Sequence, residues 1–234
     1  MQRIDQKNGL GSRVALFLLS IFALLLCLSI GLPATAEDDP TLDQILDRIE
    51  ARYTGSGFKA DFMQESTIKA MKISDFAKGK IFVSYPGKMR WEYSEPDKQI
   101  IITDGHQLWI YRPDDNQVMV GKAPVFFRDG KGASFLSNIK LLRDKFDIAL
   151  ESKEGESDLF YTLKLLPREK TMDVTEILLS VSRVTDTVVR VITLNSYGDE
   201  TRIELINFEF NANLDDSLFS FEIPEGADVV QIDE

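Results

Sequence analysis

Residues that could carry out chemistry are few in this chain. His106 is the single histidine and Cys27 the single cysteine among 234 residues. His106 follows an Asp-Gly pair, where an exposed turn residue is more common than a general base. Zinc sites are built mainly from several Cys and His ligands, and this chain has too few of these residues to form one. Gly-x-Ser-x-Gly, Gly-x-Gly-x-x-Gly and P-loop patterns do not occur either. The sequence therefore predicts no catalytic site, no metal site and no cofactor.

Two acidic pairs, Asp114-Asp115 and Asp215-Asp216, are the other candidates for a charged site. No Asp-x-Asp-x-Asp-Gly spacing accompanies them, so we interpret both as loop residues and not as calcium ligands. A hydrolase that uses an unrecognised pair of carboxylates is the least favoured alternative, because no signature of a nucleophile and its base supports it.

Large apolar side chains, by contrast, are plentiful: 15 Phe, 6 Tyr, 6 Met and 2 Trp, enough to fill a core or to line a cavity. The richest segment is 82–118. Within it Met89, Trp91 and Tyr93 alternate with charged residues, and a period of two places all three on one face of a half-buried strand. Asp104-Gly105 then predicts a tight hairpin between two further strands.

Two stretches have the spacing of amphipathic helices. Thr41 and Gln44 form a capping box at the start of the first, which covers residues 41–53. The second covers residues 133–146 and carries five apolar side chains on one face: Phe135, Leu136, Ile139, Leu142 and Phe146. Elsewhere the period is two, as in strands. This order predicts an α+β fold, with one antiparallel sheet and helices on one of its faces.

The first 36 residues have the features of a secretory signal peptide. Three basic residues precede an apolar run over 14–32, and Ala34-Thr-Ala36 forms a small-residue cleavage site. An uncleaved membrane anchor is an alternative, because the run is nearly long enough to span a bilayer. Lipidation at Cys27 is a third reading, disfavoured by the leucines before it. We expect a signal peptide over 1–36 and a single domain over 37–234.

The net charge excludes some classes of binding partner. Removing residues 1–36 takes away three basic residues and one acidic residue, so the net charge changes from −11 to −13. This acidity argues against nucleic acid and against passive adsorption to anionic lipid headgroups. The remaining chain has no cysteine, so it forms no disulfide and its stability must come from burial.

A series of short motifs runs in order through nearly all of residues 37–234. They are Phe62-Met-Gln64, Gly79-Lys-Ile-Phe82, Pro86-Gly-Lys-Met-Arg-Trp91, Glu95-Pro96, Ile101-Ile-Thr-Asp-Gly105, Leu108-Trp-Ile-Tyr111, Gln117-Val118, Asn207-Phe-Glu-Phe-Asn-Ala-Asn213 and Phe219-Ser-Phe-Glu-Ile-Pro-Glu-Gly-Ala-Asp-Val229. In this order and spacing they resemble the LolA family of periplasmic carriers of outer-membrane lipoproteins.

The resemblance implies a fold, a function and partners. The implied fold is an incomplete, half-open antiparallel β-barrel with helices forming a lid over the concave face and an acyl-chain cavity beneath it. Such proteins are monomeric periplasmic carriers and not enzymes. They accept triacylated lipoproteins from an ATP-driven (ABC-type) inner-membrane exporter and pass them to an outer-membrane receptor. A related domain that binds other acyl lipids, or a sensory or structural domain with a filled core and a protein partner, is the alternative.

Under the carrier reading, each group of apolar residues has an expected place. We expect the lipid-binding cavity to be lined by Phe62, Met89, Trp91, Tyr93 and Trp109. We expect the lid to carry Phe135, Leu136, Ile139 and Leu142.

One departure from the family pattern concerns how the lid is held closed. Family members commonly have an arginine directly before the proline of the Pro-x-x-x-x-Trp segment, where it is associated with holding the empty lid closed. Here that position is Tyr85, a candidate lid contact. Arg90 alternates out of phase with Met89 and Trp91, so it is not assigned this role. Closure is therefore expected to depend mainly on apolar packing and to be less sensitive to salt than an ionic latch.

Overall fold

The computed structural model describes residues 39–55, 57–123, 128–151, 159–169 and 171–232. The expected signal segment, its cleavage site and Cys27 lie outside these residues. Within the described part of the chain, no helix is long and apolar enough to cross a membrane.

Helix α2 (Leu42–Tyr53) forms where the capping box predicts it. The backbone amide of Thr41 donates to Gln44 Oε1 (2.9 Å), and the amide of Gln44 donates to Thr41 Oγ1 (3.3 Å). These bonds satisfy two amides that a helix start leaves without partners. The buried side of the helix, Ile45, Leu46, Ile49 and Tyr53, packs onto the sheet.

Within the described residues, twelve strands form one sheet in the order β12-β6-β5-β4-β3-β2-β1-β11-β10-β9-β8-β7. The strands are β1 (Phe58–Ile68), β2 (Ile73–Ser84), β3 (Lys88–Glu95), β4 (Gln99–Thr103), β5 (Gln107–Arg112), β6 (Gln117–Lys122), β7 (Phe146–Glu151), β8 (Phe160–Pro167), β9 (Glu176–Ser182), β10 (Val188–Leu194), β11 (Glu200–Phe210) and β12 (Asp228–Gln231). Strands β12 and β7 are its two edges, so the sheet is open, which confirms the expected incomplete barrel. One pairing departs from the antiparallel expectation, because β12 lies parallel to β6.

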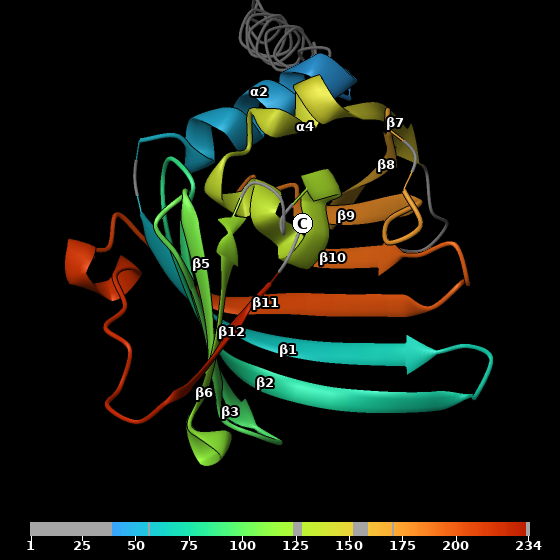
Figure 1. Ribbon diagram of the computed structural model, residues 1–234. Helices are drawn as coiled ribbons and strands as arrows, with labels where there is room; N and C mark the ends of the chain where they lie inside the picture. Colours follow the sequence, from blue (N-terminus) through green and yellow to red (C-terminus); the bar gives the residue numbers. More distant parts are fainter. Residues whose placement is uncertain (1–38, 56, 124–127, 152–158, 170, 233–234) are drawn as a thin grey trace, which may run out of the picture. The chain divides into compact units, whose positions relative to one another are not determined.

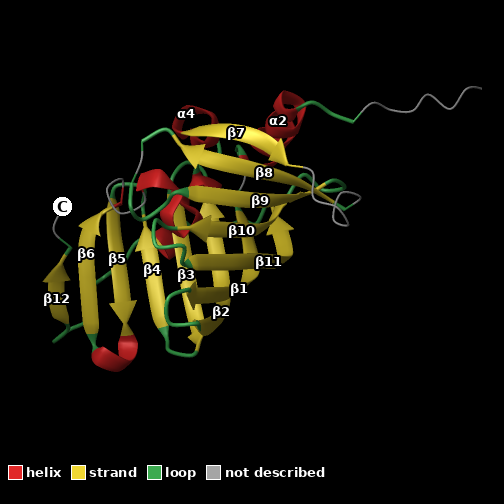
Figure 2. Cartoon of the chain, turned by 90° about the vertical axis from the view of Figure 1, so that its right-hand side faces the viewer, coloured by secondary structure: helices red, strands yellow, loops and turns green. Residues whose placement is uncertain are grey.

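The sheet bends around the elements on its inner face, as Figures 1 and 2 show. We define the inner face as the one that carries Met89 and Trp91. Antiparallel partners share a face, so Val83 and Thr103 lie beside Met89, and Ile81 lies beside Trp91. These apolar side chains form one buried cluster with α2 and with the segment around residue 135.

The continuous helix predicted over residues 133–146 is wrong. The chain forms a 3₁₀ segment, η3 (Arg128–Ser137), then a turn, and then a short helix, α4 (Leu141–Lys145). Ala133 has a φ of +54°, which an α-helix does not accept. The Ser137 hydroxyl bonds to the Ser134 carbonyl at 2.8 Å, and the Asn138 amide bonds to the Phe135 carbonyl at 3.0 Å. Short polar side chains that bond locally in this way compete with an α-helix. We call Ala133–Lys145 the lid segment.

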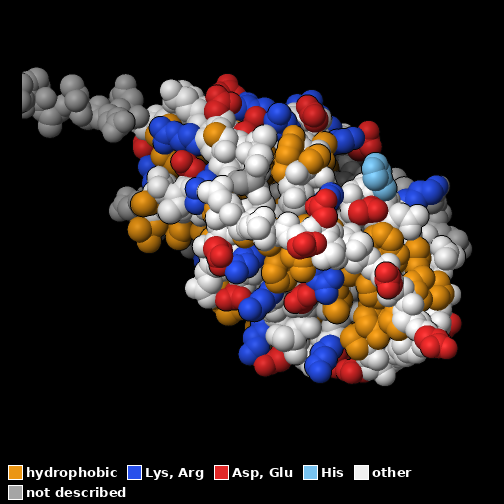
Figure 3. All heavy atoms as spheres, turned by 90° about the vertical axis from the view of Figure 1, so that its left-hand side faces the viewer, with side chains coloured by type: hydrophobic (Ala, Val, Ile, Leu, Met, Phe, Trp, Pro, Cys, Tyr) orange, Lys and Arg blue, Asp and Glu red, His pale blue; other side chains and the backbone are white. Residues whose placement is uncertain are grey.

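The outer face of β3–β6 has its own cover, formed by the C-terminal segment. After β11 the chain forms η4 (Asp216–Phe219), where the Leu218 carbonyl accepts from Arg90 Nη1 at 3.2 Å. The Phe221 ring lies 5.4 Å from that of Tyr111, measured between centroids. Figure 3 looks onto the side where η4 lies and shows hydrophobic side chains grouped among charged ones. The sheet therefore buries apolar residues on both faces here, including Ile102 and Phe219.

A buried hydrogen bond fixes α2 to the sheet and gives a first prediction. The Val188 amide donates to the hydroxyl oxygen of Tyr53 (3.0 Å), and burial raises the pKa of Tyr53, so the phenol stays neutral. Tyr53→Phe should leave that amide without a partner and lower the free energy of unfolding by about 1–3 kcal/mol. Urea denaturation measures it, with the exposed Tyr197→Phe as the control. Equal, negligible effects from both substitutions would contradict this role.

Candidate functional site

Four of the five expected cavity residues lie together on the inner face. Phe62 and Met89 are 1% exposed and Trp91 is 3% exposed. The Phe62 ring meets the Trp91 ring at 4.8 Å and the Tyr93 ring at 4.9 Å, both edge to face. This geometry is favourable for aromatic pairs. The inner face thus carries an aromatic cluster built from β1 and β3.

A glycine makes this cluster possible across the intervening strand. Gly79 of β2 pairs with Phe62 on one side and with Tyr93 on the other. A Cβ atom at Gly79 would lie 1.9 Å from the Glu92 carbonyl oxygen and 2.9 Å from Phe62 Cε1. Only glycine lets the two rings meet over β2.

Trp109, the fifth expected cavity residue, does not belong to this set. It pairs with Ile102, which in turn pairs with Arg90, so all three point to the outer face. The inner positions of β5 are Leu108 and Ile110. The expectation for Trp109 was wrong because it treated aromatic character as a sign of the inner face and did not count residues through the Asp104-Gly105 turn.

The four expected lid residues fill the space over the inner face. Phe135 and Ile139 are 1% exposed, and Leu136 and Leu142 are 2% exposed. All four belong to the same buried cluster as Met89 and Trp91. In this structure the protein's own side chains therefore occupy the inner face. A ligand that uses this face must displace them.

The lid segment is attached to the sheet by a backbone hydrogen bond. The Gly87 amide, in the turn between β2 and β3, donates to the Ser137 carbonyl at 2.8 Å. Gly87 has a φ of +80°, which favours glycine at this turn. Tyr85 is half-buried two residues earlier. Its own contact with the lid stays a prediction.

An ionic cluster, which we call the Arg143 clasp, ties α4 to α2. Arg143 Nη1 lies 2.8 Å from Asp43 Oδ1, Nε lies 2.8 Å from Glu50 Oε1, and Nη2 bonds to Asp47. Burial alone would lower the pKa of Arg143, but its carboxylate partners outweigh burial and raise it. The expectation of closure mainly by apolar packing omitted this cluster. Its sequence signal is an acidic stripe at positions 43, 47 and 50, which share one face of α2.

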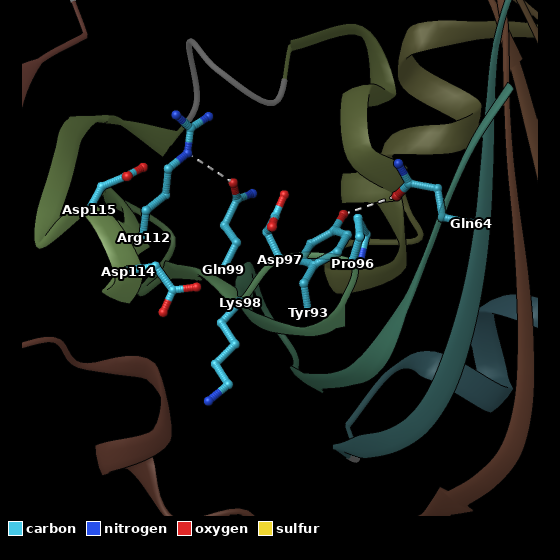
Figure 4. Close-up of a pocket in the computed structure, with 9 residues that line it drawn as sticks. All are labelled: Gln64, Tyr93, Pro96, Asp97, Lys98, Gln99, Arg112, Asp114 and Asp115. Carbon is cyan, nitrogen blue, oxygen red and sulfur yellow. Dashed lines mark hydrogen bonds between the residues drawn. The ribbon is translucent and has the colours of Figure 1, made fainter. Parts of the chain in front are cut away.

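A polar pocket of about 600 Å³ lies at one end of the aromatic cluster (Figure 4). Tyr93 Oη donates to Gln64 Oε1 at 3.0 Å, and Arg112 Nε donates to Gln99 Oε1 at 3.3 Å. Burial raises the pKa of Tyr93 to about 12, so its hydroxyl remains a donor at neutral pH. Tyr93 thus separates the apolar inner face from a polar opening, which we call the mouth pocket. It is lined by Gln64, Tyr93, Pro96, Asp97, Lys98, Gln99, Arg112, Asp114 and Asp115.

Comparison with known proteins places this geometry in a family. A family model described as "Outer membrane lipoprotein carrier protein LolA" matches residues 54–222. The chain belongs to the LolA family. The membership inferred from the order of its motifs is confirmed.

Individual proteins of the LolA family align with most of this chain. An outer-membrane lipoprotein carrier protein from Chromobacterium violaceum is 30% identical over 83% of this chain and 91% of its own. One from Chromohalobacter salexigens is 27% identical over 90% of this chain and 96% of its own. Among solved structures, an uncharacterized conserved protein from Thermus thermophilus has a TM-score of 0.53 at 14% identity, covering 81% of this chain and 98% of that one. That structure supports the fold alone.

The LolA match covers the aromatic cluster and the lid segment but begins after α2. Arg143 thus lies inside the matched range, whereas its three carboxylate partners lie before it. The acidic half of the clasp therefore lies before the range that the family model matches.

The groups first considered for chemistry occupy turns and caps. His106 is exposed, and its amide bonds to Asp104 Oδ1 at 2.8 Å. Asp215 caps η4 by accepting from the Ser217 amide (2.9 Å), and this hydrogen bond lowers the pKa of Asp215. Among the described residues, no group of three or more His, Cys, Asp or Glu is placed to hold a metal ion.

Proposed function

We propose that this protein is a non-enzymatic periplasmic carrier that shields the acyl chains of lipoproteins between the two membranes. It would accept triacylated lipoproteins from an ABC-type exporter in the inner membrane and release them to a receptor at the outer membrane. Family membership and relatives named outer-membrane lipoprotein carrier protein support this role. The observation that carries the proposal is the inner apolar face covered by the lid segment of the same chain. Cleavage after Ala36 would release the 37–234 domain as a monomer.

Acyl chains need such a cover in water. Each methylene removed from water is worth about 0.8 kcal/mol, so exposing two 16-carbon chains to water costs roughly 25 kcal/mol. A protein that shields them must still release them. Binding through many non-directional apolar contacts meets both needs better than a site with fixed hydrogen bonds.

When a lipoprotein loads, its acyl chains must replace the lid segment on the inner face. Each of its four large apolar side chains gains about 1.5–3 kcal/mol from burial, or roughly 6–12 kcal/mol together. Opening the lid gives up that burial, and acyl chains on the inner face replace it. Part of the affinity for lipid is therefore offset by the cost of opening, which keeps cargo transferable.

The two tryptophans allow a direct test, because they lie on opposite faces of the sheet. Trp109→Phe leaves Trp91, on the inner face, as the only tryptophan, and Trp91→Phe leaves Trp109, on the outer face, as the only one. A lipopeptide with bromine-labelled acyl chains should quench Trp91 strongly and Trp109 little. Equal quenching of both, or none, would contradict binding on the inner face.

The filled inner face also supports a second candidate, a sensory or structural domain that binds a protein partner and no lipid. Lipid extraction from the purified protein separates the two proposals. Lipid or lipoprotein that co-purifies supports the carrier. Its absence, together with no quenching of Trp91, supports the second candidate.

A further inference from the structure

The hairpin between β1 and β2 projects beyond the strands beside it (Figure 1). Strand β11 pairs with β1 only as far as Thr67, and β3 pairs with β2 only from Lys78 onward. Residues 68–77 therefore extend past the partners that cover the rest of the hairpin. We call residues 68–76 the hairpin tip.

Large apolar side chains on the hairpin tip are exposed to solvent. Met71 is 63% exposed and Phe76 is 66% exposed, and Ile68 and Ile73 face each other across the two strands at 41% and 45%. Elsewhere on this sheet, most residues of these types are buried or half-buried, although Met63 and Ile206 are also exposed. Phe76 lies three positions after Ile73 on β2, so the tip exposes apolar side chains on both of its faces. Exposed apolar side chains that gather in this way mark a contact surface.

Two neighbouring loops add to this surface. The Lys69 amide bonds to Asp199 Oδ1 at 3.0 Å, which brings the β10–β11 loop with Tyr197 against the tip. The Ser196 amide bonds to the Met172 carbonyl at 3.0 Å, which adds the loop before β9. Tyr197 is 68% exposed and Met172 is 59% exposed. Three separate loops thus present apolar side chains at one end of the sheet.

The charges at the tip favour a membrane as its occupant. Lys69 and Lys72 are the only charged residues between Ile68 and Ile73, and neither forms an ion pair with another described residue. Asp75 is the one acidic residue of the tip itself, and the neighbouring Asp199 already accepts the Lys69 amide. Long lysine side chains beside apolar ones suit the bilayer interface, where the stems bury and the ammonium groups reach the headgroups.

The rest of the chain determines how the tip would meet a bilayer. The whole chain carries a net charge of −11, so anionic headgroups repel most of its surface. Contact through the tip keeps that surface away. A groove of about 630 Å³ runs from Phe76 at the tip to Gln64, Pro96 and Asp97, which also line the mouth pocket. Tip-first contact therefore brings the mouth pocket near the lipid surface.

We propose that the hairpin tip is a membrane-docking site that inserts Met71, Phe76 and their apolar neighbours into the headgroup region of a phospholipid bilayer. The contact is shallow and reversible, because a few apolar side chains and two lysines provide weak anchoring. This inference goes beyond the carrier function and does not depend on it.

The test is flotation with vesicles of phosphatidylethanolamine and phosphatidylglycerol, mixed three to one, using the protein without its signal segment. The native protein should float with the vesicles. Met71→Asp combined with Phe76→Asp should reduce the bound fraction at least tenfold. Val184→Asp is the matched control, because Val184 is 88% exposed in the β9–β10 turn, away from the tip.

A second variant tests the charges. Lys69→Gln combined with Lys72→Gln should weaken binding by about fivefold per lysine on anionic vesicles and little on purely zwitterionic ones. Circular dichroism checks the fold, and Trp91 quenching should be unchanged in every tip variant. No flotation of the native protein, or equal flotation of the aspartate double variant, overturns the proposal. Loss of cargo transfer to a purified receptor with vesicle binding intact would overturn it in favour of a protein partner. Failure of Trp91 quenching instead contradicts the carrier function and leaves the docking site standing.

Discussion

Ile139→Ala is expected to weaken the fold and, at the same time, to tighten the binding of acyl chains. Ile139 belongs to the lid segment and is 1% exposed, packed in the same cluster as Met89 and Trp91. An ordinary core substitution weakens folding and gives no gain in binding. The opposite signs are expected because, in the proposed carrier function, the lid and the acyl chain compete for the same face.

The size of both effects follows from the cavity that the substitution creates. Removing a buried isoleucine to alanine lowers the free energy of unfolding by about 2–5 kcal/mol. Some of this loss destabilises the closed position of the lid relative to the open one, so a larger fraction of the protein is open. Since apparent affinity scales with the fraction of protein competent to bind, a loss of about 1.4 kcal/mol in closure tightens the apparent Kd about tenfold.

A matched substitution on the other face provides the control. Ile102 is also 1% exposed, but it points to the outer face beneath the C-terminal segment. Ile102→Ala should lower the free energy of unfolding by a similar amount and leave the Kd for a fluorescent lipopeptide unchanged. Denaturation and lipopeptide titration of both variants provide the measurements. If both alanine variants bind more weakly, or both more tightly, the lid does not compete with lipid.

Alternation along strands predicted correctly which of these side chains share a face, because it depends on local geometry alone. Met89, Trp91 and Tyr93 share a face as their spacing requires, and Phe62 meets them through the pairing of β1, β2 and β3. Trp109 failed because the face of a strand depends on its register with the strand before it. Register in turn depends on how many residues the turn uses.

The lid segment shows where helical spacing was misleading. Phe135, Leu136, Ile139 and Leu142 are buried as the pattern predicted, but the chain reaches that result through a 3₁₀ segment, a turn and a short helix. Apolar residues spaced three or four apart are compatible both with one continuous α-helix and with this broken arrangement. The positive φ of Ala133 and the local hydrogen bond of Ser137 decide between them, and both depend on the tertiary setting.

The Arg143 clasp alters the expected response of the lid to salt. Tyr85 in place of the family arginine suggested closure by apolar packing, with little dependence on ionic strength. The structure adds three carboxylates around one guanidinium, and Asp43 and Asp47 are mostly exposed to solvent. Exposed ion pairs contribute roughly 0.2–1 kcal/mol each and weaken as salt rises. Lid closure therefore has both an apolar part and a salt-sensitive part.

Reversing the charge at position 143 should separate the apolar contribution to lid closure from the salt-sensitive one. In Arg143→Glu a fourth carboxylate faces Asp43, Asp47 and Glu50, so attraction between α4 and α2 becomes repulsion. We expect closure to weaken by about 1–3 kcal/mol at low salt, which tightens lipopeptide binding by roughly five- to 150-fold. High salt should reduce the gain by screening the repulsion.

Two further variants distinguish a latch from a general electrostatic effect. Lys59→Glu reverses the charge of a residue paired with Glu209 on strands β1 and β11, away from the lid, and should leave lipopeptide affinity unchanged at every salt concentration. Adding Glu50→Arg to Arg143→Glu restores one opposite-charge pair between α2 and α4 and should return part of the native affinity. Lipopeptide titrations from low to high ionic strength compare the three variants with the native protein. Equal affinity of Arg143→Glu and the native protein at low salt would mean that apolar packing alone holds the lid, as the absence of the family arginine first suggested.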